Sequence, residues 1–284
     1  MSQWPCHAPA TATAWWSLRF FCLLLTLLGG SLAPAGAQWP VTDSRVFETL
    51  PHGQINWTEG LVLGRDSVPG SPRSGTGAAT QHAALHAARQ SVQRLLARVR
   101  LDGRQTLGER LQQPQSQQAL TALAAQAEVV ETRYRAGGTV ETVVQVSIAG
   151  RLTALLLPPD TDVRLDSPAS NEAVHSGIVI DARGLAIQPA LLPQLVDEQG
   201  QGIYTPGTVS TEAAVQQGYV AYARAFDQAP AQARIGERPL VLRAQRVADA
   251  TRVDLVLSQT DAARLRDYAA TRRLLQQCRV LIVM

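Results

Sequence analysis

The chain has 284 residues and a formal net charge of +3 at pH 7, and every basic residue other than histidine is arginine. Hydrophobic residues make up 45% of the sequence, which is typical of a globular protein and excludes a disordered or membrane-embedded chain. Aromatic residues make up 5%, and acidic residues interrupt the arginines, so the composition does not indicate a nucleic-acid-binding protein. The length suits two domains.

Residues 1–37 have the pattern of a secretory signal peptide. Arg19 precedes an apolar stretch, Phe20–Leu28, and the small residues of Ala35–Ala37 match a cleavage site. We therefore expect export, cleavage after Ala37 and a mature chain that starts at Gln38. A retained membrane anchor is the alternative, although the apolar stretch is shorter than the ~20 residues that span a bilayer.

The mature chain keeps one cysteine, Cys278, because Cys6 and Cys22 lie in the signal peptide. A single cysteine forms no internal disulfide, so packed cores must stabilise the protein. We interpret Cys278 as a small buried apolar residue rather than a nucleophile.

After a leader over residues 38–53, residues 54–158 have the pattern of an α+β domain. A helix is predicted over Ala78–Arg100, where apolar residues recur at three- and four-residue steps. A hairpin is predicted around Ala136–Gly138, with Val140, Val144, Val146 and Ile148 facing inward and Val143 facing out. The other predicted elements are a strand over Ile55–Gly64, a helix over Gln115–Gln126, and the two hairpin strands Glu128–Arg135 and Thr139–Ile148.

His82 and His86 stand four residues apart on the predicted helix, a spacing that can place two imidazoles on one metal ion. No carboxylate lies between them and no third ligand is evident, so we interpret them as partly exposed helix residues. The chain has no motif for a metal or another cofactor.

Residues 159–176 form a linker rich in proline and aspartate. Asp160, Asp162 and Asp166 resemble a calcium loop, but Arg164 occupies a ligand position and the glycine of the sharp turn is missing. Because exposed linkers make few contacts, we expect limited proteolysis to cut here and release two stable fragments.

The second predicted domain covers residues 177–284. The apolar run Ile178–Ile180 predicts a fully buried strand, and Asp181–Gly184 follows it as a charged turn, a place where open α/β sheets present functional groups. Asp197–Gly202 connects two short apolar runs as a hairpin. Asp181, Arg183, Asp197 and Glu198 are therefore the candidate ligand-binding or structural polar residues, and for Asp181 and Arg183 we favour a structural ion pair.

Later segments of this domain predict further strands and helices. Ser210 and Ser258 are predicted helix N-caps. The segment Gly218–Ala223 is compatible with a helix end or a strand. Predicted elements are a helix over Thr211–Gln217, a buried strand at Leu240–Leu242, an alternating strand at Arg252–Leu257, a helix from Ser258 to Gln276, and a terminal strand Arg279–Met284 that must lie inside a sheet. The predicted fold class is α+β, with helices packed on a mainly antiparallel sheet in each domain.

Two sets of residues carry a resemblance to known families. The segments Ile55–Gly64, Ala83–Arg98 and Val99–Gly103, with the paired strands up to Gly150, resemble the N-terminal domain of the flagellar assembly protein FlgT and related small outer-membrane lipoproteins. The second domain is similar to uncharacterised exported proteins of Gram-negative bacteria, through Gly177–Leu185, Pro189-Ala190, Asp197-Glu198, Tyr204, Val215–Gly218, Tyr222-Ala223 and Cys278–Val280. The resemblance implies a periplasmic location, an envelope-associated structural or assembly role, and no catalytic residue.

Three functional hypotheses follow. The favoured one is a non-enzymatic envelope protein with envelope proteins as partners, including flagellar basal-body or outer-membrane components, and with no nucleic acid. The second is a ligand-binding protein or hydrolase that uses Asp181 and Arg183 with Asp197 or Glu198. The third is a protein that adheres through its arginines to anionic lipid or glycan, a peripheral membrane contact.

Overall fold

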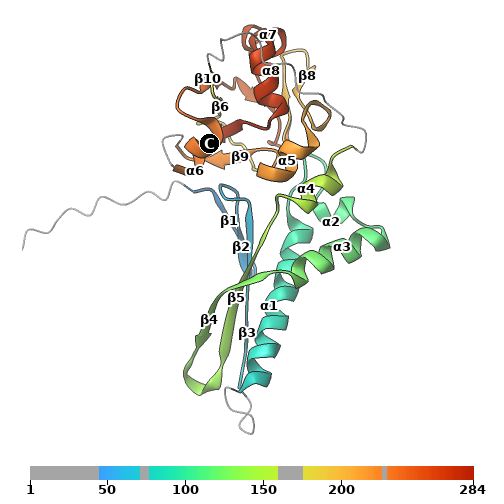
Figure 1. Ribbon diagram of the computed structural model, residues 1–284, viewed down its shortest axis with the longest axis vertical. Helices are drawn as coiled ribbons and strands as arrows, with labels where there is room; N and C mark the ends of the chain where they lie inside the picture. Colours follow the sequence, from blue (N-terminus) through green and yellow to red (C-terminus); the bar gives the residue numbers. More distant parts are fainter. Residues whose placement is uncertain (1–44, 71–76, 159–174, 226–228) are drawn as a thin grey trace, which may run out of the picture. The chain divides into compact units, whose positions relative to one another are not determined.

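The computed structural model describes residues 45–70, 77–158, 175–225 and 229–284. The predicted signal peptide and most of the predicted linker, including its aspartates Asp160, Asp162 and Asp166, lie outside these residues. The fold is α+β, as predicted, with helices and sheets both in residues 45–158, here called the N-terminal part, and in residues 175–284, the C-terminal part (Figure 1). None of the helices in the described ranges is both long and apolar enough to span a membrane.

One antiparallel sheet forms the centre of the N-terminal part, and its strands lie in the order β1-β2-β3-β5-β4. The segment Ile55–Gly64, predicted as one strand, is a hairpin instead, because the chain turns at Trp57–Gly60 and Gly60 takes a φ of +65° that favours glycine. The predicted β4–β5 hairpin is confirmed. The bounds are β1 Phe47–Leu50, within the stretch interpreted as a leader, β2 Gly53–Asn56, β3 Leu61–Val68, β4 Glu128–Tyr134 and β5 Val140–Ser147.

Helix α1 (Ala78–Arg98) packs along one face of this sheet (Figure 1). Its buried side chains include Val92, Leu95 and Leu96, which confirms the predicted apolar stripe. At Gly64 of β3, a Cβ atom would lie 2.6 Å from Cγ2 of Val92 and 2.9 Å from the carbonyl oxygen of Ala88. The helix and the strand therefore approach more closely than any side chain at this position would allow.

Shorter helices complete the N-terminal part. Helix α3 confirms the second predicted helix, and α1 contacts both α2 and α3. The inward set of β5 is also as predicted, since Val140 and Val144 are fully buried and Val143 is half-buried. The bounds are α2 Leu107–Arg110, α3 Pro114–Ala125, the 3-10 turn η1 Ala136–Gly138, and α4 Arg151–Leu156.

The main sheet of the C-terminal part is parallel, which corrects the expectation of a mainly antiparallel sheet there. Its strands lie in the order β10-β6-β13-β9, and every neighbouring pair is parallel. The unbroken apolar runs in β6 and β13 are typical of parallel strands covered on both faces, whereas the direction of pairing depends on the crossovers between strands. The bounds are β6 Ile178–Asp181, β9 Ala221–Ala223, β10 Leu240–Arg243 and β13 Val280–Val283.

Both faces of this parallel sheet are covered. Helix α6 (Ala229–Ile235) packs on one face, where Ala231 and Ile235 join Val179 and Leu281 in a small apolar cluster. Helix α8 (Ala269–Gln276) packs on the other face. All four residues of β13 are buried, which confirms that the terminal strand lies inside a sheet.

A second, small sheet has the order β11-β12-β7-β8, and its antiparallel β7–β8 pair confirms the predicted hairpin. The predicted helix that starts after Ser258 breaks at Tyr268, which has extended backbone angles, so that α7 and α8 are separate. The Thr271 hydroxyl donates to the carbonyl oxygen of Tyr268 at 2.8 Å, which satisfies an acceptor at the break. The bounds are β7 Leu195–Val196, β8 Gly202–Tyr204, η2 Pro206–Thr208, α5 Thr211–Gln217, β11 Arg246–Val247, β12 Leu255–Val256 and α7 Gln259–Asp267.

Backbone and ring contacts connect the two parts. The N–H of Leu192 donates to the carbonyl oxygen of Leu101 at 2.8 Å, and the Arg100 guanidinium donates to the carbonyl oxygen of Pro189 at 2.8 Å. The rings of Trp57 and Tyr222 meet edge to face, with centroids 5.9 Å apart. Buried residues of both parts belong to one hydrophobic core.

Candidate functional site

Asp181 and Arg183 form a two-point ion pair at the carboxyl end of β6. Nε of Arg183 donates to Oδ1 of Asp181 at 2.9 Å, and a terminal guanidinium nitrogen donates to Oδ2 at 2.7 Å. The backbone N–H of Arg183 also donates to Oδ1, at 3.1 Å. The hydrogen bond from the Arg183 side chain lowers the pKa of Asp181, so the carboxylate stays charged at neutral pH. The pair fixes the turn that ends at Gly184, whose φ is +83°.

Asp197 holds the β7–β8 turn together. Its Oδ1 atom accepts the backbone N–H groups of Gln199 at 3.0 Å and Gln201 at 2.8 Å. Its Oδ2 atom accepts a hydrogen bond from Arg266 of α7 at 2.8 Å. Burial on its own would raise the pKa of Asp197, but the hydrogen bonds from Arg266 and Gln201 outweigh burial and lower it. Asp197 is 1% exposed, so its carboxylate is committed to the turn and to α7.

Glu198 points to a different neighbour. Its Oε1 atom accepts a hydrogen bond from the side-chain amide of Gln245 at 3.0 Å, and both residues are exposed. The four candidate residues therefore lie in separate contacts: Asp181 with Arg183, Asp197 with Arg266, and Glu198 with Gln245. The structure does not bring them together as one catalytic group.

A buried tyrosine cluster lies in the C-terminal part, and sequence reasoning did not single it out as a group. The Tyr204 hydroxyl donates to the carbonyl oxygen of Tyr219 at 2.6 Å, and the two rings stack with centroids 4.5 Å apart. The Tyr222 hydroxyl donates to the carbonyl oxygen of Ala190 at 2.9 Å and accepts the Ala190 N–H at 3.0 Å. Burial raises the pKa of all three tyrosines, so they remain neutral. The hydroxyls of Tyr204 and Tyr222 are hydrogen-bonded, whereas the buried hydroxyl of Tyr219 has no hydrogen-bond partner among the described residues.

Cys278 and Arg234 lie beside this cluster. Burial raises the pKa of the Cys278 thiol to about 11, which leaves it protonated near neutral pH and agrees with its interpretation as a packing residue. The Arg234 guanidinium donates to the carbonyl oxygens of Cys278 at 2.6 Å and Gly218 at 3.2 Å. Burial lowers the pKa of Arg234, yet backbone carbonyls satisfy its donors.

Two of the cavities among the described residues are large enough to consider, one beside the tyrosine cluster and one in the N-terminal part. One, of about 70 Å³, is lined by residues that include Trp57, Ala190, Tyr219 and Arg234. Pockets that enclose a small-molecule ligand usually measure about 300–1,000 Å³, so this space suits a few water molecules better than a substrate. The second, of about 370 Å³, is a groove between α3 and α4 with mainly apolar side chains, and it lacks the converging polar groups that orient a substrate.

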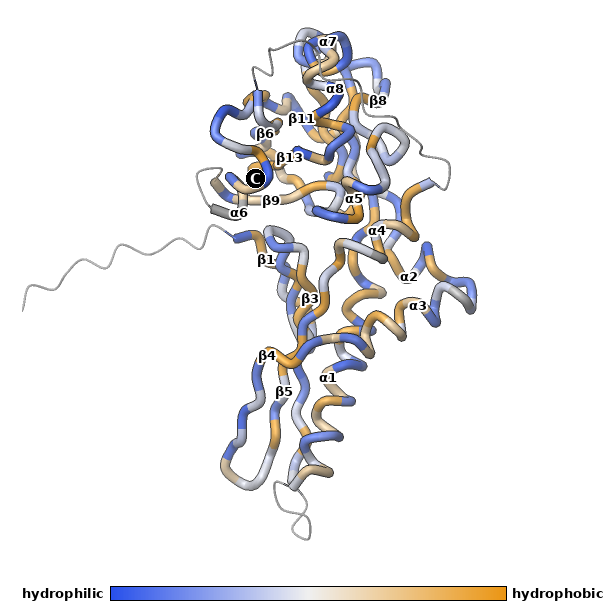
Figure 2. Tube along the Cα trace, in the orientation of Figure 1, coloured by the Kyte–Doolittle hydropathy of each residue, from blue (hydrophilic) through white to orange (hydrophobic). Residues whose placement is uncertain are grey.

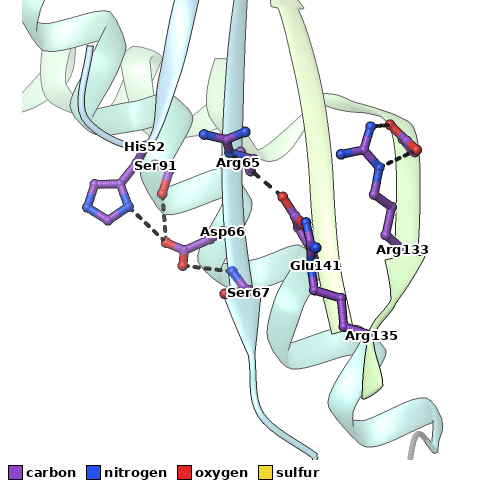
Figure 3. A network of polar contacts seen from close by, with 9 residues as sticks. His52, Arg65, Asp66, Ser67, Ser91, Arg133, Arg135 and Glu141 are labelled. Atoms are coloured by element: carbon purple, nitrogen blue, oxygen red, sulfur yellow. Dashed lines mark hydrogen bonds and ion pairs between the residues drawn. The ribbon is translucent and has the colours of Figure 1, made fainter. Parts of the chain in front are cut away.

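Charged residues also gather on both faces of the N-terminal sheet (Figure 3). Toward α1, Asp66 accepts the Ser91 hydroxyl at 2.9 Å and lies 3.6 Å from the Arg94 guanidinium. On the opposite face, Glu141 accepts a hydrogen bond from Nε of Arg135 at 2.8 Å and lies 3.8 Å from Nε of Arg65. The contacts of Asp66 with α1 and of Glu141 with Arg65 join segments far apart in the sequence, whereas Arg135 and Glu141 are six residues apart across the predicted β4–β5 hairpin.

The predicted helix histidines are both exposed on α1. Within the described ranges, no three or more His, Cys, Asp or Glu side chains are grouped so as to hold a metal ion. The hydrogen bonds and ion pairs described above are instead the contacts of turns, strand pairs and helix–sheet packing.

Comparison with known proteins places the C-terminal part beside a known domain family. A family model described as Treponema pallidum Tp0624, second domain, matches residues 177–284, which begin one residue before β6 and include every later element. No curated protein matches the chain. The matched region coincides with the second domain predicted from the sequence.

Proposed function

We propose that this protein is exported to the periplasm of a Gram-negative bacterium and has a structural or assembly role in the cell envelope. Its partners are envelope proteins, which include components of the flagellar basal body or the outer membrane. The signal-peptide pattern of residues 1–37 supports export, and the resemblance to FlgT supports the role. The match to a domain of a Treponema pallidum protein supports a bacterial origin.

The main support for a non-catalytic role is that the candidate carboxylates are already engaged in hydrogen bonds within the fold. Asp181 and Asp197 each accept several hydrogen bonds, from Arg183 in one case and from Arg266 and turn N–H groups in the other. Their pKa values are lowered rather than raised, so neither is poised as a general acid or base near neutral pH. Both groups support the fold around them.

A ligand-binding role is the second candidate, and one observation favours it. Asp181 lies at the carboxyl end of a parallel strand, directly beside Arg243 of β10 in the strand register. Ligands of open α/β sheets bind at this edge. In this role, the Arg183 guanidinium would exchange Asp181 for an anionic group of the ligand.

Localisation and complementation test the proposal together. The full chain, with a C-terminal tag, is produced in its bacterial host, and we expect it in the periplasmic or outer-membrane fraction with Gln38 as its N-terminal residue. A matched variant without Phe20–Leu28 should remain in the cytoplasm. Recovery of full-length protein from the cytoplasm would contradict the export proposal.

A deletion strain separates the two candidate roles. The strain is tested for envelope integrity and motility, and then complemented with wild type or with Asp181→Asn. For a structural role we expect Asp181→Asn to complement whenever it accumulates to the wild-type level. Failure of an abundant, correctly located Asp181→Asn protein would favour the ligand-binding role instead.

A further inference from the structure

Strand β4 is one of the two edge strands of its sheet. In the described part of the chain, β5 pairs with one edge of β4 and no strand pairs with the other. Six large hydrophobic side chains of the described residues are exposed, and three of them lie on this one strand: Val129 and Val130 at 51% and Tyr134 at 56%. A free edge with exposed apolar side chains is a template for pairing with another strand. Figure 2 shows that β4 changes from hydrophobic at its start to hydrophilic further along.

We propose that β4 pairs antiparallel with β4 of a second copy of this chain, about a two-fold axis at Thr132. The two five-stranded sheets then become one continuous sheet across the dimer. A two-fold axis makes the interface isologous, so the same strand must be complementary to itself. Whether β4 is complementary to itself depends on three features: the direction of its backbone N–H and C=O groups, the positions of its charges, and the positions of its apolar side chains.

The backbone limits where the axis can lie. The N–H of Arg135 donates to the carbonyl oxygen of Thr139 at 2.9 Å, toward β5. Backbone groups alternate along an antiparallel strand, so Arg133 and Glu131 also face β5, while Thr132 and Tyr134 present their N–H and C=O groups to the free edge. In a β4–β4 pair, an even-numbered residue can therefore lie opposite only an even-numbered residue, and an odd-numbered residue opposite only an odd-numbered one. A two-fold axis that meets this condition passes through a residue and not between two residues.

The charges of β4 favour one position for the axis among the residues through which it can pass. An axis at Glu131 sets Glu131 opposite its own copy, and an axis at Arg133 does the same for Arg133, which places like charges face to face. An axis at Thr132 sets Glu131 opposite Arg133 of the second copy, twice, and places Thr132 opposite itself. Opposite charges directly across a strand pair stabilise it, and like charges destabilise it. The Thr132 register is therefore the self-complementary one at the middle of the strand.

The same register also covers the apolar residues. Tyr134 of each copy lies at the end of the paired stretch, next to the bulge residue Val130 of the other copy, so two half-exposed side chains lose contact with water at each end of the pair. Within one chain, Arg133 already contacts Glu131, with a terminal guanidinium nitrogen 2.6 Å from the carboxylate. In the dimer, each arginine then lies between two glutamates. The β-bulge at Val130 leaves the regular stretch from Glu131 onward free to pair.

Charge reversal tests the register. In sedimentation velocity over a concentration series of the purified full chain, we expect a reversible dimer. Glu131→Arg and Arg133→Glu should each weaken it by about tenfold or more, because each replaces two attractive pairs with two repulsive ones. The double variant E131R/R133E exchanges the charges and should restore the dimer. Circular dichroism of each variant checks that the fold is intact, as expected for side chains that are 43% and 49% exposed.

Cysteine crosslinking tests the position of the axis. In a background with Cys6→Ser and Cys22→Ser, Cys278 is buried with its pKa raised to about 11, so an added surface cysteine is the reactive thiol. Facing residues of a hydrogen-bonded pair have Cα atoms about 5.5 Å apart, within the range of a disulfide. Thr132→Cys should therefore form a covalent dimer under mild oxidation. In Tyr134→Cys, the two thiols would be four residues out of register, roughly 13 Å apart, and should not react.

Each outcome decides the proposal. A dimer that is lost in the single charge variants, restored in the double variant and crosslinked at position 132 supports it. A wild-type chain that stays monomeric at its highest soluble concentration overturns it, and so does a dimer that Glu131→Arg leaves unchanged. The proposal does not depend on the envelope role, because self-pairing is measured on purified protein irrespective of location.

Discussion

The two main sheets of the protein differ in how their faces are covered. The antiparallel sheet of the N-terminal part has α1 on one face, while its other face carries the charged residues Arg65, Glu141 and Arg135. The parallel sheet of the C-terminal part lies between α6 and α8, and its central strand β13 is entirely buried. A strand buried on both faces stabilises the fold but offers little surface to a partner.

This difference in coverage suggests that the C-terminal sheet serves mainly stability and that the N-terminal sheet is the one open to recognition. In the C-terminal part, the conspicuous charges Asp181 and Asp197 fix turns at the ends of strands. In the N-terminal part, an exposed sheet face and the free edge of β4 are available for contacts with other proteins. We therefore expect substitutions in the parallel sheet to change stability, and substitutions on β4 to change association.

The largest expected effect is at the centre of the parallel sheet. Leu281 of β13 is fully buried, so Leu281→Ala should lower the free energy of unfolding by about 2–5 kcal/mol through lost burial and a cavity. Leu155 of α4 is 57% exposed, and the matched change Leu155→Ala should stay within about 0.5 kcal/mol. Urea denaturation of both variants measures the contrast. Equal effects would show that the parallel sheet is not the more tightly covered region.

The next largest effect is expected at the covered face of the antiparallel sheet. Gly64→Ala places a methyl group within 3 Å of backbone atoms of α1 and should cost about 1–3 kcal/mol of unfolding free energy. At Gly207, the nearest atom to an added methyl group is 4.0 Å away, so Gly207→Ala serves as the control. Thermal melting compares the two variants. A neutral Gly64→Ala would mean that α1 can move away from β3 without cost.

Much of this architecture was predictable from local patterns. The period of the apolar residues in α1 and the turn residues between β4 and β5 identified both elements, and the apolar run at Ile178–Ile180 identified a buried strand. Strand direction in the C-terminal sheet was predicted wrongly, because direction depends on how crossovers pass over a sheet and not on residues within a strand.

The contacts of the candidate site were predictable only where they are local. The ion pair between Asp181 and Arg183 spans two residues of one turn, and the sequence indicated it. The Asp197–Arg266 contact joins residues 69 positions apart, and the Tyr222–Ala190 contact joins residues 32 positions apart. Only the folded chain brings such pairs together.

A smaller effect is expected at Asp197. Asp197→Asn removes the negative charge and replaces the Oδ2 acceptor of Arg266 with an amide N–H group, while Oδ1 can still accept from the β7–β8 turn, so we expect the melting temperature to fall by several degrees at pH 7. Glu198→Gln, next to it and exposed, is the matched control and should leave melting unchanged.

The pH dependence follows from the lowered pKa of Asp197. A carboxyl group whose pKa is lower in the folded state stabilises the protein above its unfolded pKa, near 3.9, and this contribution is lost as the pH falls through the folded value. Below about pH 4, the melting temperature of wild type should therefore fall more steeply than that of Asp197→Asn. Parallel acid profiles would contradict the assignment of this ion pair.

The smallest effect is expected at Asp181, the residue that most resembles an enzyme group in the sequence. Its partner Arg183 is 57% exposed, and ion pairs open to water contribute little to stability. Asp181→Asn keeps the backbone contact to Arg183 and should shift the melting temperature by less than about 3 °C. Melting with and without envelope extracts, peptidoglycan fragments or anionic lipid vesicles distinguishes the two candidate roles. If wild type is stabilised by one of these probes and Asp181→Asn is not, the carboxyl edge of the parallel sheet is a binding site, and the contrast between a closed C-terminal part and an interacting N-terminal part no longer holds.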